Sequence, residues 1–179
     1  RKFTNDKVPD KVIKKCLEAA ILAPNSSNLQ PWEFYWIKNK NKKDNIAKAC
    51  FSQNAAITAQ ELIVAVSRID TWKRNKNLII EDYKKKNKYI PIINRYYNKL
   101  IPILYYHDIF GVSNIVKKLF SIFYNLFGFF KPVLRSPIYK HELFEVVTKS
   151  TALACQNLML GLVAEGFDSC PMEGFDEKK

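Results

Sequence analysis

A polar loop bounded by two prolines is the first segment whose side chains could do chemistry. It reads APNSSNLQPW, Ala23 to Trp32, and it places short amide and hydroxyl side chains between Pro24 and Pro31. Short donors and acceptors on a stiffened backbone can bind a polar, phosphate-bearing or ring-edged ligand at a low ordering cost. Asn and Ser are also common turn formers, so the loop could equally be a plain connection between a helix and a strand. The loop alone does not separate these two interpretations.

A second candidate segment, CPMEGFD, runs from Cys170 to Asp176. A proline precedes and a glycine follows its Met172-Glu173 pair, an arrangement that can leave backbone N–H groups exposed. Gly174 has no side chain, so a flat ligand could approach the main chain closely there. On its own this pattern is weak.

The remaining reactive side chains give little indication of a site. The four cysteines are widely spaced and form no CxxC or Cys/His pattern, so we expect no metal site, and free thiols indicate a reducing cytoplasm. His107 and His141 are isolated, and we expect surface positions for both. The five glycines include no G-x-G-x-x-G motif, so no separate nicotinamide-binding Rossmann domain is expected. The cysteines are Cys16, Cys50, Cys155 and Cys170.

Together, and in this order, three segments resemble the FMN-dependent nitroreductase family. They are Arg1-Lys2-Phe3, APNSSNLQPW and ALACQNLMLGLVAEGFDSCPMEGFD. The resemblance covers both ends of the chain, whereas about 70–140 carries no matching motif and corresponds to the family's variable covering region. We therefore identify 1–179 as a single nitroreductase-like domain. We expect it to be incomplete at both ends, because it begins at Arg1 and lacks the family's preceding Arg-x-Ser and the strand and basic residues beyond Lys179.

This resemblance implies an α+β fold in which helices flank a central, mainly antiparallel sheet. It also implies an intertwined homodimer with two FMN sites at the subunit interface. NADH or NADPH would donate hydride to FMN, and a small-molecule acceptor such as a nitroaromatic or a quinone would then take electrons in a ping-pong cycle. The flavin carries the redox chemistry, so no catalytic side chain is expected.

The resemblance further implies ten cofactor-binding residues. Arg1 corresponds to a basic residue near the flavin pyrimidine edge or phosphate, where a guanidinium would stabilise the negative charge of the reduced ring. A loop that reaches the flavin bound mainly by the other subunit comprises Pro24, Asn25, Ser26, Ser27 and Asn28, with Asn25 where the family usually has serine. A segment along one flavin face, with a backbone N–H near N5, comprises Pro171, Met172, Glu173 and Gly174. Gln53 is a further candidate at the ring edge.

Hydrophobic periodicity predicts the elements that would position these segments. We expect a first helix within 8–24, with Pro9 in its first turn and Pro24 at its end. Strands are predicted at Glu33–Ile37 and Leu62–Val66, with helical segments at 42–50 and 54–60 between them. The last helix, Thr148–Gly166, is apolar nearly all round, which predicts a central and fully buried helix.

The middle of the chain contains one further helical pattern, Asn114–Phe130. Its polar residues gather on one narrow face and apolar residues cover the rest. The uncharged run Leu119–Phe130 is too short to cross a bilayer, which needs about 20 residues. We therefore expect either a covering helix buried against the domain or a partner subunit, or a helix that lies in a membrane interface.

The net charge of +12 is high, and the excess of Lys and Arg is concentrated between Arg68 and Lys99. No RNA- or DNA-reading motif accompanies it, so we expect a solvated helical face and no nucleic-acid partner. Two alternatives to an enzyme remain open. The protein could bind flavin without turnover, or it could be a peripheral membrane protein that uses the helix at 114–130.

Overall fold

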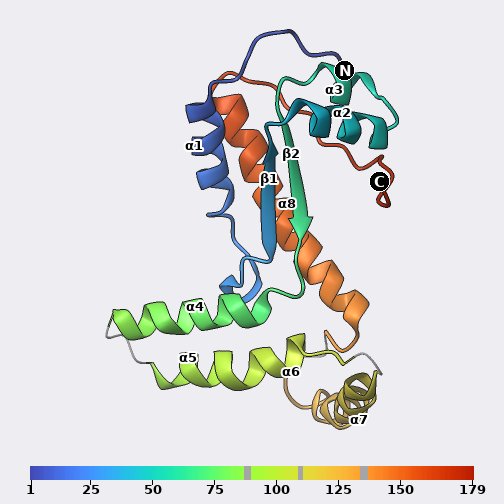
Figure 1. The fold of residues 1–179 in the computed structure, drawn as a ribbon. Coiled ribbons are helices and arrows are strands. Elements are labelled where there is room, and N and C mark those ends of the chain that lie inside the picture. Colours follow the sequence, from blue (N-terminus) through green and yellow to red (C-terminus); the bar gives the residue numbers. More distant parts are fainter. Residues whose placement is uncertain (87–89, 109–110, 134–136) are drawn as a thin grey trace. The chain divides into compact units, whose positions relative to one another are not determined.

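The computed structural model describes residues 1–86, 90–108, 111–133 and 137–179, which form two compact units (Figure 1). The first unit comprises 1–25, 32–66 and 150–179, and the second comprises 26–31 and 67–149. Part of the basic stretch predicted to be a helical face, 87–89, lies outside the described residues. The assignment of 1–179 to one domain with a covering region at 70–140 stays a prediction.

In the first unit, two antiparallel strands, β1 (Trp32–Ile37) and β2 (Leu62–Ser67), pair in a small sheet. Both predicted strands are confirmed, and each is one residue longer than predicted. The accompanying helices are α1 (Asp10–Ala20), α2 (Lys40–Ala49), α3 (Asn54–Thr58) and the later part of α8 (Lys140–Ala164). The α+β class is therefore correct.

The core of the first unit forms where α1 packs against the later part of α8 (Figure 1). One face of α1 buries Ile13, Cys16 and Ala20, as the helical spacing predicts. Gly161 lets the two helices approach closely, because a Cβ added there would lie 3.3 Å from the sulfur of Cys16. From α8, the core receives Leu158 and Leu162.

The first helix ends earlier than predicted. It stops at Ala20, and the N–H groups of Leu22 and Ala23 bond to carbonyls only three residues back. Ala23 precedes Pro24, and the proline ring disfavours helical backbone in the residue before it. Pro24 therefore lies beyond the helix in the polar loop, and Pro9 is the residue before the first turn rather than within it.

The second unit is helical. It contains the 3₁₀ turn η1 (Ser26–Asn28), α4 (Trp72–Lys85), α5 (Pro91–Arg95), the π-helical turn η2 (Tyr96–Leu100), α6 (Ile101–Tyr105), α7 (Val112–Phe127) and the first part of α8. The π turn has a local cause, because Pro102 has no N–H to bond the carbonyl four residues back. The core of this unit is a cluster of seven buried residues: Leu29, Trp72, Tyr97, Ile101, Tyr105, Leu143 and Val147.

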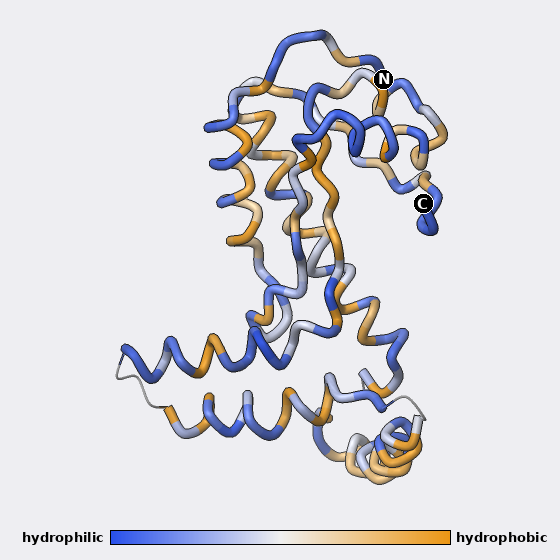
Figure 2. Tube along the Cα trace, in the orientation of Figure 1, coloured by the Kyte–Doolittle hydropathy of each residue, from blue (hydrophilic) through white to orange (hydrophobic). Residues whose placement is uncertain are grey.

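One prediction about burial is wrong for this chain, that of the last helix, whereas the partner-covered and membrane-interface alternatives for the helix at 114–130 stay predictions. The helix predicted at 114–130 forms as α7, but none of its residues is buried, and Figure 2 shows apolar colour along it. The last helix forms, but it begins at Lys140 rather than at the predicted Thr148, and it is not buried all round as predicted, because Leu153, Leu160 and Val163 are exposed. An apolar pattern predicts a helix and a preference for burial, but it does not say which surface does the covering.

Candidate functional site

In the first unit, Arg1 lies beside the carboxyl-terminal segment that the sequence singles out. Its guanidinium Nη1 donates a 2.9 Å hydrogen bond to the carbonyl of Ser169, immediately before that segment. Further along, the N–H of Asp176 donates to the carbonyl of Ala49 at 2.9 Å. Residues almost the full length of the chain apart are thereby brought together.

Gln53 contacts the same segment from the loop after α2. Its side-chain Nε2 donates a 3.0 Å hydrogen bond to the carbonyl of Gly174. The two residues before it, Phe51 and Ser52, have left-handed backbone angles (φ 55° and 49°), which non-glycine residues adopt at a cost. A hydrogen bond from the N–H of Ser52 to the carbonyl of Ala47 holds this turn.

The segment itself combines one anchored side chain with exposed backbone. Met172 packs against the buried cluster of Ala47, Cys50 and Ala56, whereas Pro171, Glu173 and Gly174 are exposed. Within the described residues, the N–H groups of residues 172–174 have no hydrogen-bond partner in the chain. Three backbone donors are thus available to a ligand.

Gly174 is not required by the fold of this chain. Its φ is not in the left-handed range, and the nearest atom to an added Cβ would be Gln53 Nε2 at 3.4 Å. A side chain would therefore fit at this position in the isolated chain. The absence of one leaves the backbone open to close approach from outside.

The polar loop divides between the two units. Pro24 and Asn25 belong to the first, where Asn25 Nδ2 donates to the carbonyl of Ala23 at 3.2 Å. The residues Ser26, Ser27 and Asn28 form the 3₁₀ turn of the second unit. Ser27, Asn28 and Gln30 all have positive φ, so this short stretch holds three non-glycine residues in left-handed backbone.

Side chains from the middle of the chain hold this strained turn. Tyr96 Oη shares a 2.6 Å hydrogen bond with the hydroxyl of Ser27, and Tyr97 Oη donates to the carbonyl of Ser27 at 2.9 Å. Burial raises the pKa of Tyr97, so its hydroxyl keeps its proton and can donate. Asn75 Nδ2 donates to the carbonyl of Leu29 at 2.8 Å. Strained backbone persists only where its surroundings determine it in this way.

These three anchoring side chains were not predicted from the sequence. Tyr96, Tyr97 and Asn75 lie far from the loop in the chain and belong to no motif. Only their positions in the fold reveal them.

The two histidines are not part of this arrangement. His141 is exposed, as predicted, and His107 is half-buried. Its Nδ1 lies 3.2 Å from the carbonyl of Tyr105, and its Nε2 lies 3.3 Å from Lys117 Nζ. Within the described ranges, no three His, Cys, Asp or Glu side chains gather in a way that could hold a metal ion.

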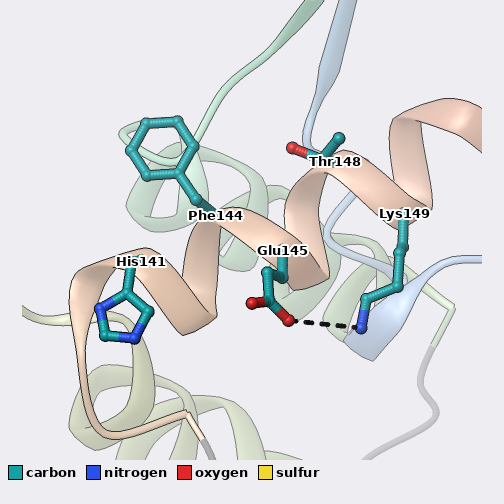
Figure 3. A pocket seen from close by; sticks show the side chains of 5 residues that line it. All are labelled: His141, Phe144, Glu145, Thr148 and Lys149. Carbon is teal, nitrogen blue, oxygen red and sulfur yellow. Dashed lines mark ion pairs between the residues drawn. The ribbon is translucent and has the colours of Figure 1, made fainter.

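A shallow depression lies on the first part of α8, away from every predicted site residue in sequence (Figure 3). All five side chains that line it come from consecutive turns of one helix, and all are exposed. Glu145 and Lys149 form an ion pair at 3.9 Å, a common spacing on a solvated helix face. Such an arrangement offers no enclosed donor set for a cofactor.

Comparison with known proteins gives a consistent result. The model of the Nitroreductase family matches residues 1–94 and 123–179, which leaves 95–122 unmatched. The DrgA protein of Synechocystis is 28% identical over 166 residues, which are 93% of this chain and 61% of that protein. A Staphylococcus epidermidis protein provisionally named an NAD(P)H nitroreductase is 25% identical over 97% of this chain and 67% of its own length.

Solved structures agree on the fold. A provisionally named nitroreductase of Exiguobacterium sibiricum, in complex with FMN, superposes with a TM-score of 0.65 at 23% identity, covering 99% of this chain and 70% of that one. A nitroreductase family protein of Streptococcus pneumoniae superposes with a TM-score of 0.67 at 21% identity, covering 99% and 73%. At these identities the likeness concerns the fold alone.

Proposed function

We propose, from the premise that this chain belongs to the nitroreductase family, that the whole protein is an FMN-dependent oxidoreductase that uses NADH or NADPH. The name of the staphylococcal relative refers to NAD(P)H, and the Exiguobacterium structure contains FMN. The chain spans 61% of the length of DrgA, so this proposal concerns the full-length protein.

The observation that carries the proposal is the cluster of Arg1, Gln53 and the segment 171–174. A flavin ring needs hydrogen-bond donors along its edge and a flat surface beside its face. Among the described residues, the backbone N–H groups of 172–174 have no partner, and the main chain at Gly174 is open although a Cβ would fit there. The residues present therefore fit an FMN.

Bound FMN would supply the redox chemistry, by taking hydride from a reduced nicotinamide and passing electrons to an acceptor. In our proposal the chain binds the FMN and orients its ring. The guanidinium of Arg1 stabilises negative charge at the pyrimidine edge or the phosphate, and a backbone N–H of 172–174 directs the ring at its N5 edge. In this proposal donor and acceptor use one open site in turn, which is ping-pong behaviour. We propose nitroaromatics, quinones or similar small molecules as acceptors.

We further propose that the protein is a homodimer and that Pro24, Asn25, Ser26, Ser27 and Asn28 serve the flavin bound mainly by the second copy. The exposed apolar side chains on the later part of α8 support a dimer, because Leu153, Leu160 and Val163 lie along one helix without cover from the described part of the chain. α8 is long and apolar enough to cross a bilayer, but it supplies Ala154, Leu158 and Leu162 to the cores of the first unit. The four cysteines are free thiols, which fits a cytoplasmic location.

The test is an absorbance spectrum of the purified full-length protein, followed by addition of NADH or NADPH under nitrogen. Flavin bands that bleach on addition and return with a nitroaromatic or quinone would support the proposal. A yellow protein that neither nucleotide bleaches would be a flavin-binding protein without turnover. A colourless protein that does not take up added FMN would contradict the proposal altogether.

Arg1→Ala tests the assigned role of the guanidinium. A charged hydrogen bond contributes about 1.5–3 kcal/mol, so FMN affinity or the rate of flavin reduction should fall by at least about tenfold. Lys2→Ala, which removes an adjacent exposed positive charge, is the matched control and should change neither by more than about twofold. Unchanged affinity together with unchanged reduction in Arg1→Ala would exclude this placement of Arg1.

A further inference from the structure

α7 presents its apolar side outward rather than to the second unit. None of its residues is buried, and several large side chains, among them Ile115, Leu119, Phe120, Phe123, Leu126 and Phe127, are each more than half exposed. The apolar surface continues past the helix, because Phe129 and Phe130 are more than 80% exposed. A contiguous exposed patch of this kind marks an interaction surface.

The polar side of α7 is the side that holds it to its unit. Lys117 Nζ donates to the carbonyls of Leu104 and Tyr106 at 3.0 and 2.8 Å, at the carboxyl end of α6. Burial lowers the pKa of Lys117, which is the cost of turning a lysine inward. This attachment fixes which side of the helix faces out.

The start of α7 is fixed as well. The carboxylate of Asp108 accepts hydrogen bonds from the N–H groups of Val112 and Ser113, at 2.8 and 2.6 Å. In return, the hydroxyl of Ser113 accepts from the N–H of Asp108 at 3.2 Å. The helix is thus anchored by its N-terminus and by its polar stripe, and its apolar side remains uncovered by the described part of its own unit.

The charged residues along this stretch of the chain are all basic. The sequence has no Asp or Glu between Asp108 and Glu142. Lys118, Lys131 and Lys140 are exposed along this stretch. A second copy of α7 would bring only further lysines, whereas an anionic lipid surface would complement them.

The length of the helix indicates how it could meet a bilayer. α7 has 16 residues, fewer than the roughly 20 that a spanning helix needs. An amphipathic helix with basic residues and with Phe and Leu on its apolar face instead lies in the plane of the interface, about 5–10 Å deep.

We propose that α7 docks on an anionic phospholipid surface, with its apolar side at the acyl boundary and Lys118 and Lys131 among the headgroups. Most of α7 lies within 95–122, the part that the family model does not match. The attachment does not depend on the flavin chemistry. The attachment would place the protein where apolar acceptors dissolve.

The test is sedimentation of the full-length protein with vesicles of phosphatidylcholine mixed with phosphatidylglycerol, against vesicles of phosphatidylcholine alone. We expect binding to the mixed vesicles that weakens in salt and is much weaker without phosphatidylglycerol. Phe120→Glu should lower vesicle affinity at least about tenfold, because it removes an aromatic side chain that docking would bury in the bilayer and adds a negative charge. Lys118→Gln should lower it on the order of fivefold.

Leu78→Glu is the matched control for Phe120→Glu. Leu78 lies on α4 of the same unit and is 58% exposed, against 61% for Phe120, so both changes add one negative charge at a similarly exposed position. The control should bind vesicles within about twofold of the unchanged protein. Circular dichroism of each variant checks folding, and flavin content is followed separately, so loss of vesicle binding is distinguished from loss of the cofactor.

Several results would overturn the proposal. One is that the unchanged protein stays in the supernatant when mixed vesicles are added. Another is that Phe120→Glu sediments with mixed vesicles to the same extent as the unchanged protein. An equal loss in Leu78→Glu would show a general charge effect. A further result would be that the unchanged protein does not bind vesicles, while sedimentation velocity without vesicles shows that Phe120→Glu dissociates an oligomer. In that case a second copy of the chain covers α7 instead. As an independent readout, the emission of Phe123→Trp should shift to the blue when mixed vesicles are added, and no shift would also contradict docking.

Discussion

At the scale of single residues, two glycines have different roles: the backbone conformation of the fold requires one, whereas cofactor binding is proposed to require the other. Gly166, at the end of α8, has a φ of 83°, a backbone conformation that costs an L-residue about 1–2 kcal/mol. Gly174 has no such angle, and an added Cβ would meet only the far end of Gln53 at 3.4 Å. Fold stability should therefore depend on the first glycine, and cofactor binding on the second.

We predict that Gly174→Val changes the free energy of unfolding by less than about 0.5 kcal/mol but lowers FMN affinity at least about tenfold. The branched side chain would occupy the space next to the flavin face. Gly166→Ala, the control, should lose about 1–2 kcal/mol of stability with FMN affinity unchanged. Urea unfolding and flavin titration measure the two quantities. Full FMN affinity in Gly174→Val would show that the backbone does not approach the ring there.

Tyr96 is the residue whose role the tertiary structure adds. Its hydroxyl bonds that of Ser27 in a turn of left-handed backbone, so we predict that Tyr96→Phe loosens this turn. FMN affinity should fall about fivefold, because one hydrogen bond contributes about 1 kcal/mol. Tyr106→Phe is the control, because the hydroxyl of Tyr106 has no hydrogen bond within the described residues. Equal affinities in the two variants would mean that the turn does not reach the flavin.

At the scale of elements, the N-terminus of α7 depends on one carboxylate. Hydrogen bonds from Ser113 and from the N–H of Val112 hold the pKa of Asp108 at about 2, below its ordinary value of 3.8. A carboxyl with a depressed folded pKa contributes stability above its unfolded pKa and loses it as the pH falls through the folded value. The contribution of Asp108 should therefore be full above about 3.8 and vanish near 2.

We predict that amide hydrogen exchange in the first turns of α7 is slower in the unchanged protein than in Asp108→Asn at neutral pH. Asparagine keeps an acceptor at this position but carries no charge, so the difference should shrink below about 3.8 and disappear near 2. Comparing the two proteins at each pH removes the intrinsic pH dependence of exchange. A difference that persists at low pH would mean that another group supports the start of the helix.

At the scale of the whole molecule, the later part of α8 carries the proposed contact between two copies. We predict that Leu160→Glu raises the dissociation constant of the dimer at least about tenfold, because burying a leucine contributes about 1.5–3 kcal/mol and a buried unpaired charge opposes association. Leu160 is 57% exposed and Leu78 is 58% exposed, so Leu78→Glu, on α4, is a control matched in exposure and added charge on a different helix. Sedimentation equilibrium of the full-length protein measures both. Equal dissociation constants would place the contact elsewhere.

Much of the fold could be predicted from local patterns. The helix over 10–20 follows from apolar residues at helical spacing, and the strand at 62–67 follows from a short apolar run, because both signals depend on neighbours in sequence. The ends were less predictable. Pro24 was expected to end the first helix, yet the proline also restrains the residue before it, so the helix stops at Ala20.

By itself, the sequence determined the family, the two segments expected at the cofactor and the amphipathic character of α7, since each depends on residue types in a fixed local order. Only the tertiary structure brought Arg1 beside Ser169 and Gln53 beside Gly174, and placed Tyr96 on the turn at Ser27. It also decided that α7 turns its apolar side outward, through the hydrogen bonds of Lys117. The physical reason is that periodicity fixes which side chains share a helix face, whereas burial depends on what the rest of the chain packs against that face.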